Sequence, residues 1–141
     1  MPDHPLIHMT PRFFTHSRGE FFRTLDQALL PGYRAFPNVR LGDVFQSEAP
    51  AAQDLTARMQ HEHVDFLIVA VTDARPVAAI TLSGTGGDHA GQQRRDGMMD
   101  LIFGSAGLLL LRLRSEDVHT HASLEATLWE HLKPAERYEL V

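Results

Sequence analysis

Asp65 is the residue whose type and position first suggest chemistry. It is the one acid in the apolar run Val64–Val71, directly after the His61-Glu62-His63 segment. An acid at the mouth of a buried strand is costly unless hydrogen bonds or a cation satisfy it. Two roles therefore stay open for Asp65, a metal ligand or a structural acid bonded to backbone amides or an arginine.

Other polar residues are candidates for the same site. Thr81 and Ser83 alternate along an apolar segment and therefore share one face of an extended strand. Asp65 joins that face only if the hairpin register is right, since a slip by one residue removes it. Packed hydroxyls are the alternative role for both residues. Glu20 is three residues after Ser17, a capping-box spacing that explains it without any ligand role.

Four arginines form a candidate nucleic-acid-binding patch: Arg94, Arg95, Arg112 and Arg114. The alternative is that Arg95 pairs with an acid such as Asp65. The net charge of −5 and the isoelectric point near 5.9 argue against a dedicated non-specific nucleic-acid binder. Only one of the thirteen basic residues is a lysine, Lys133.

Zinc, thiol and P-loop chemistry have weaker support. The nine histidines include two His-x-His pairs, His61/His63 and His119/His121, which are zinc-ligand types without an accompanying motif. The chain has no cysteine, which excludes disulfides and thiolate sites and fits a reducing compartment. The glycine-rich stretch 84–91 lacks the Gly-Lys-Ser/Thr ending of a P-loop.

Periodicity predicts the elements that must position these residues. Helices are expected over 17–29, 92–106 and 123–132, with capping hydroxyls at Ser17 and Ser123 and a C′ glycine at Gly107. Strands are expected within 33–45, interrupted at Pro37-Asn38, and over 64–71, 77–83 and 108–113, and a helical turn is expected at 54–59. Strands 64–71 and 77–83 form a hairpin, and the crossover through helix 92–106 makes strands 77–83 and 108–113 parallel.

The length of 141 residues predicts one domain, residues 17–141, preceded by an irregular arm, residues 1–16. The start lacks the pattern of a signal peptide, and every apolar run is far shorter than a membrane span. We therefore expect a cytoplasmic protein without membrane association. The fold class is α/β, a mixed central sheet flanked by helices.

The chain resembles a bacterial domain-of-unknown-function family of the restriction-endonuclease-like PD-(D/E)xK superfamily. The resemblance covers roughly residues 10–132. It is carried by these segments: Ser17-Arg18-Gly19-Glu20-Phe21-Phe22 with Leu25, Val39-Arg40-Leu41, Val64-Asp65-Phe66, Pro76 to Ile80, Arg95-Asp96, and Ala106 to Arg112. It implies an αβββαβα core in which magnesium activates water to attack a phosphodiester.

By position, the resemblance implies that Asp65 and Glu20 are the metal ligands and that Asp65, Glu20, Thr81 and Ser83 stand at catalytic positions. Thr81 and Ser83 replace the metal-binding Glu and the last charged residue, and hydroxyls are poor ligands for a hard divalent cation. The expected function is thus a degenerate nuclease-fold module that binds nucleic acid or protein, with Mg²⁺ absent or weakly bound. The alternative is an active Mg²⁺-dependent DNA or RNA endonuclease that uses Asp65, Glu20 and a migrated acid such as Asp88.

Overall fold

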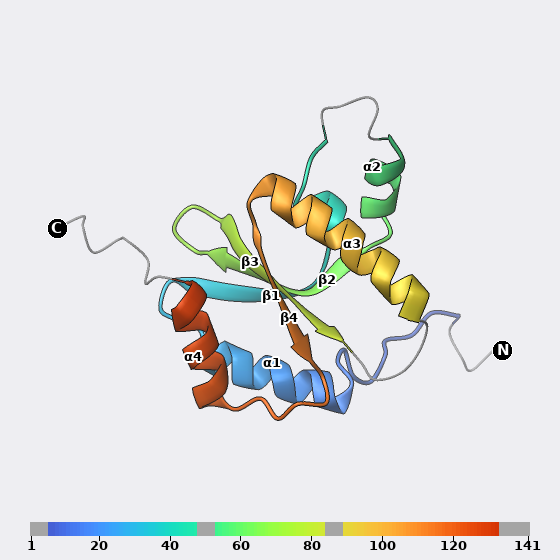
Figure 1. Ribbon diagram of the computed structural model, residues 1–141. Coiled ribbons are helices and arrows are strands. Elements are labelled where there is room, and N and C mark those ends of the chain that lie inside the picture. The colour runs from blue at the N-terminus through green and yellow to red at the C-terminus, as the bar shows by residue number, and fades with distance from the viewer. Residues whose placement is uncertain (1–5, 48–52, 84–88, 133–141) are drawn as a thin grey trace.

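The computed structural model describes residues 6–47, 53–83 and 89–132, which form a four-stranded mixed sheet flanked by helices (Figure 1). The elements are α1 (His16–Ala28), β1 (Tyr33–Arg40), the short 3₁₀ helix η1 (Leu41–Asp43), α2 (Gln53–Met59), β2 (His63–Ala70), β3 (Arg75–Ser83), α3 (His89–Ala106), β4 (Leu109–Arg114) and α4 (His121–His131). The predicted α/β class is confirmed. None of the described helices is long and apolar enough to cross a membrane.

The strands lie in the order β1-β2-β3-β4, with β1–β2 and β2–β3 antiparallel and β3–β4 parallel. The predicted hairpin and the parallel crossover through α3 are therefore confirmed. In the hairpin, Phe66 lies opposite Ile80, and a register shift falls between Ile68 and Val69. This pairing brings Asp65, just before Phe66, to the end of β3 where Thr81 and Leu82 lie.

The predicted break in the first strand is wrong. β1 runs without interruption through Pro37 and Asn38, and both flanking positions stay paired with β2. Proline is tolerated because β1 is an edge strand, which has a neighbouring strand on one side only. Asn38 has a φ of 52°, a left-handed conformation that asparagine adopts more readily than most residues.

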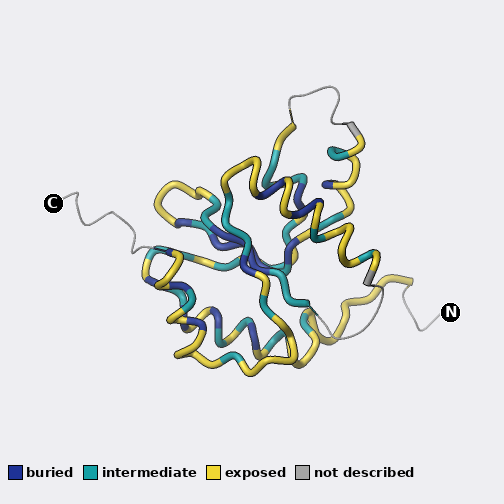
Figure 2. Tube along the Cα trace, in the orientation of Figure 1, coloured by how far each residue is buried: buried dark blue, intermediate teal, exposed yellow. Residues whose placement is uncertain are grey.

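Each face of the sheet has its own hydrophobic core. One core joins β2, β3 and β4 to α1 and α4, and its largest fully buried members include Phe66, Leu25 and Leu128. The other lies under α3 and α2, with Met98, Ile102 and Phe103 against Val64 and Leu67. Figure 2 shows the buried residues concentrated where the helices face the sheet. Burial on both faces is the physical reason for the near-continuous apolar runs of β2 and β3.

Both predicted helix caps are shifted by a few residues. α1 begins at His16, and the hydroxyl of Thr15 accepts the backbone N–H of Arg18. Ser17 and Glu20 therefore lie inside the helix and do not form its capping box. In α4 the N-cap is Thr120, and Ser123 is the N3 residue of a capping box that includes both hydroxyls. Gly107 has a φ of 72° after α3, as the prediction of a C′ glycine requires.

Replacing Thr15 by alanine tests the assigned start of α1. The Thr15→Ala variant is expected to lose about 1 kcal/mol of unfolding free energy, because an orphan N–H of the first turn loses its acceptor. The matched Ser17→Ala variant is expected to stay close to wild type, since Ser17 is already helical. Urea unfolding measures the free energy of unfolding of both variants. A larger loss in Ser17→Ala than in Thr15→Ala would show that Ser17 is the N-cap.

Candidate functional site

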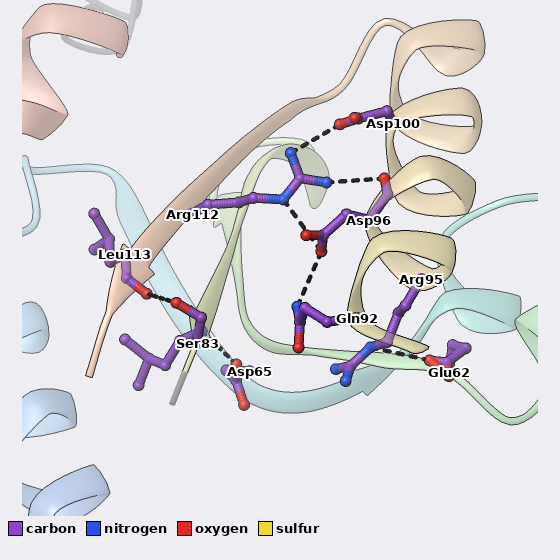
Figure 3. Close-up of polar contacts among 10 residues, drawn as sticks. Glu62, Asp65, Ser83, Gln92, Arg95, Asp96, Asp100, Arg112 and Leu113 are labelled. Carbon is purple, nitrogen blue, oxygen red and sulfur yellow. Dashed lines mark hydrogen bonds and ion pairs between the residues drawn. The ribbon is translucent and has the colours of Figure 1, made fainter. Parts of the chain in front are cut away.

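The carboxylate of Asp65 is held by an arginine and a backbone amide. The Arg18 guanidinium forms an ion pair with Oδ1, and the backbone N–H of Leu82 donates to Oδ2 at 2.6 Å. The Asp65 side chain is 14% exposed, so most of it is out of water. Figure 3 shows it beside the end of β3. These contacts match the second role considered for Asp65, that of a structural acid bonded to a backbone amide and an arginine.

Four elements meet at this ion pair. Arg18 lies in the first turns of α1, where it also donates to the side-chain oxygen of Asn38 at 3.3 Å. Asn38 lies between the two β1 residues that pair with Val64 and Phe66, so it is across from Asp65. We name this set, Arg18, Asn38 and Asp65, the Arg18 clamp. It joins α1 to β1, β2 and, through the Leu82 N–H, to β3.

Glu20, the second predicted metal ligand, has a different environment. Its side chain is 59% exposed and lies 3.2 Å from the imidazole of His16, one turn earlier on α1. Among the described residues, no group of three or more His, Cys, Asp or Glu side chains is placed to hold a metal ion. Asp88, a candidate for the migrated acid, lies outside the described residues.

The donor set at the end of β3 does not fit a divalent cation. Magnesium is bound by carboxylate oxygens in near-octahedral geometry. Here both Asp65 oxygens already accept hydrogen bonds, one of them from a cationic group, and the neighbouring side chains on β3 are hydroxyls. The Arg18 guanidinium supplies the positive charge that a metal would otherwise bring to this carboxylate.

Thr81 and Ser83 lie on β3 beside β4. The parallel register places Thr81 next to Arg112 and Ser83 next to Arg114. The Ser83 hydroxyl is 3.4 Å from the backbone oxygen of Leu113, and the Ser83 carbonyl accepts both the N–H and the hydroxyl of Ser115. Ser83 thus helps to join the ends of two strands, which is the packed-hydroxyl role.

The predicted arginine patch is largely neutralised by acids. Arg112 contacts Asp100 at 2.8 Å and also the backbone oxygen and carboxylate of Asp96, as Figure 3 shows. Arg95 pairs with Glu62 at 3.3 Å, and Arg114 pairs with Glu116. These three arginines thus pair with four carboxylates, which gives the group a net charge of −1. Adding the exposed Arg94 brings the net charge of the patch to zero.

The two histidines of the second His-x-His pair have separate partners. His119 Nε2 lies 2.7 Å from the backbone oxygen of Arg114, and its ring packs edge-on against Phe21 with centroids 5.2 Å apart. His121 lies 3.3 Å from Glu125 on its own helix. The contacts of this pair are those of structural histidines.

A cavity of about 540 Å³ separates α1 from the connection between β4 and α4. We call it the α1 groove. Its wall on α1 consists of Ser17, Arg18, Glu20, Phe21, Arg23, Thr24 and Gln27, and the other side consists of Leu82 and residues Ser115, Asp117, Val118 and His119. Sequence reasoning missed this groove because its two helical and loop sides are about 90 residues apart, and no local pattern shows that they face each other.

Comparison with known proteins places the chain in a family but assigns no activity. A family model described as "Protein of unknown function (DUF2726)" matches residues 11–132. This span contains every described element from α1 to α4. No curated protein and no solved structure matches the chain.

Proposed function

The chain belongs to the DUF2726 family, and we propose that it is a restriction-endonuclease-like domain whose degenerate catalytic site no longer cleaves phosphodiesters. We propose that the domain serves instead as a protein-interaction module in the bacterial cytoplasm. The observation that carries the proposal is the Arg18 clamp, which occupies the carboxylate of Asp65. The PD-(D/E)xK assignment rests on the sequence resemblance. The observed order of α1, β1, β2, β3, α3, β4 and α4, with α2 inserted after β1, is compatible with it.

The clamp explains why this site would not perform hydrolysis. A metal ion in a nuclease lowers the pKa of its bound water and so generates the attacking hydroxide. A guanidinium stays protonated, binds no water as a Lewis acid and offers only hydrogen-bond donors. Arg18 can therefore neutralise Asp65 without activating a nucleophile, and Thr81 and Ser83 add no carboxylate or amine to the site.

The charge distribution favours a protein partner over nucleic acid. The neutralised arginine patch lacks the positive field that drives phosphate binding. The segment before α1 exposes several large apolar side chains, each at least 68% accessible: Leu6, Ile7, Met9 and Phe13. Exposed apolar surface of this kind is typical of sites that contact other macromolecules.

Calorimetric titration of Mg²⁺ and Mn²⁺ tests the proposal. We expect no saturable heat at millimolar metal and no cleavage of plasmid DNA or single-stranded RNA, because the Arg18 guanidinium already neutralises Asp65 and no second carboxylate lies beside it on β3. The matched variant Arg18→Gln removes the competing cation and leaves the carboxylate in place. Metal binding that appears only in this variant would identify the clamp as the element that blocks the site.

The opposite outcome is equally clear. Saturable metal binding by the wild-type chain, lost in Asp65→Ala, together with metal-dependent cleavage, would establish the active endonuclease instead. A Glu20→Gln variant then shows whether the acid on α1 takes part. Circular dichroism of each variant confirms that the fold is kept.

A further inference from the structure

We infer that the α1 groove binds an extended peptide segment that carries one acidic and one basic side chain. The inference rests on the proposed function, since it names the surface and the partner chemistry of the interaction module. The volume of about 540 Å³ lies in the range of roughly 300–1,000 Å³ that is typical of ligand sites.

Two uncompensated charges of opposite sign line the groove. Arg23 comes from α1 and Asp117 from the connection after β4, so the two charges belong to the two sides of the groove. Neither side chain has an ion pair or hydrogen bond within the described part of the chain. Of the other charged groove residues, Arg18 is paired with Asp65, whereas Glu20 contacts the His16 imidazole, which balances its charge only when the ring is protonated. Complementary charges on a ligand would meet Asp117 on one side and Arg23 on the other.

His119 adds a hydrogen-bonding side chain to the lining of the groove. Its Nε2 faces the carbonyl oxygen of Arg114 at 2.7 Å, so in the neutral ring we assign the proton to Nε2 and leave Nδ1 as an acceptor. The edge-on contact with Phe21 holds the ring in place. Gln27 contributes both an amide donor and an amide acceptor. Donors and acceptors together suit the alternating N–H and C=O groups of a peptide backbone.

Apolar side chains complete the lining. Phe21 is buried, Leu82 is half-buried and packs against the same core, and Val118 is 86% exposed at the edge of the groove. These apolar side chains of the lining give an apolar residue of the ligand a surface to cover. Burial of that surface would contribute most of the affinity, and the charges would fix the direction of the peptide.

The same charges disfavour a nucleic-acid strand. A single strand carries a negative charge on every phosphate and binds in positively charged grooves. Arg23 and Asp117 cancel, and Glu20 adds a negative charge when His16 is neutral, so the α1 groove has no net positive charge to attract phosphates. A zwitterionic peptide segment matches this pattern, whereas a polyanion leaves Asp117 opposed to a like charge.

Selection from a random peptide library displayed on phage tests the inference with the full chain as bait. We expect the enriched peptides to carry an acid and a base at a constant spacing. Selection on the doubly exchanged variant, Arg23→Asp with Asp117→Arg, is expected to enrich the opposite order of the two charges. In a synthetic peptide taken from the wild-type selection, each single substitution is expected to weaken binding about fivefold, the effect of an exposed charge pair.

The matched control is Arg34→Asp, an exposed arginine on β1 that does not line the groove. It should leave peptide affinity unchanged. Enriched peptides without the charge pair, or an equal loss of affinity in Arg34→Asp, would overturn the inference. So would tight binding of a labelled single-stranded oligonucleotide that is lost in Arg23→Asp. Metal binding and cleavage are measured separately, so failure of the groove inference is distinguishable from failure of the proposed function.

Discussion

Replacing Asp65 by alanine is expected to lower the free energy of unfolding by about 3 kcal/mol, because the substitution leaves two donors without their acceptor. The Leu82 N–H loses its 2.6 Å partner, and the Arg18 guanidinium, 32% exposed, loses its counter-charge. The sheet would keep its backbone ladders, but α1 would then be joined to it at this site only by the Arg18–Asn38 hydrogen bond and by packing. Urea unfolding followed by circular dichroism measures the loss.

Three comparisons make this result specific to the clamp. Asp65→Asn keeps one oxygen acceptor and is expected to lose less than Asp65→Ala. Asp26→Ala removes an exposed acid of α1 and should change stability by less than about 0.5 kcal/mol. In an Arg18→Gln background the Asp65→Ala loss should shrink, since the two residues interact directly. An Asp65→Ala variant as stable as wild type would show that the clamp contributes nothing to folding.

Replacing Phe66 by alanine is expected to cost about 4 kcal/mol, the typical loss for a buried phenylalanine. Phe66 is fully buried, and its ring lies 5.5 Å from Phe21, 5.9 Å from Phe22 and 6.1 Å from Phe14, measured between centroids. This cluster fills the space between the sheet and α1, so the cavity cannot be closed by one small movement. With total stabilities of about 5–15 kcal/mol in domains, the variant should unfold at a much lower temperature.

Phe36→Ala is the matched control for Phe66→Ala. Phe36 is a phenylalanine of the same sheet, but it lies on the edge strand β1 and is 48% exposed. Its loss should cost less than about 1 kcal/mol, because little apolar area leaves the core. Thermal unfolding compares the two, and a loss of similar size in both would contradict the assigned core.

The strands and helices followed from local pattern because the pattern records burial. The apolar runs at 64–71 and 77–83 indicated strands covered on both faces, and β2 and β3 lie between two cores. The hairpin and the parallel crossover followed from the turn at 72–76 and from helix 92–106. The exact starts of the helices could not be predicted from the sequence. Hydroxyl residues lie at both Thr15 and Ser17, and the path of the chain before α1 selects between them as the N-cap.

The local sequence pattern also could not predict that β1 is continuous. Pro37-Asn38 is a breaker dipeptide in isolation. Pairing with β2 on both sides of it keeps the strand extended, and the left-handed Asn38 then directs its side chain oxygen to Arg18. Pairing with β2 thus places Asn38, where the sequence predicted a break in the strand, in the Arg18 clamp.

By itself the sequence determined that Asp65 needed a partner, because an acid at the start of a buried strand is costly without one. It also determined that Thr81 and Ser83 cannot replace a carboxylate. Only the tertiary structure decided that the partner is Arg18, 47 residues away on α1, and that Arg95, Arg112 and Arg114 are paired with acids. The α1 groove likewise exists only in the folded chain. Such contacts depend on the packing of helices against the sheet, which local residue patterns do not encode.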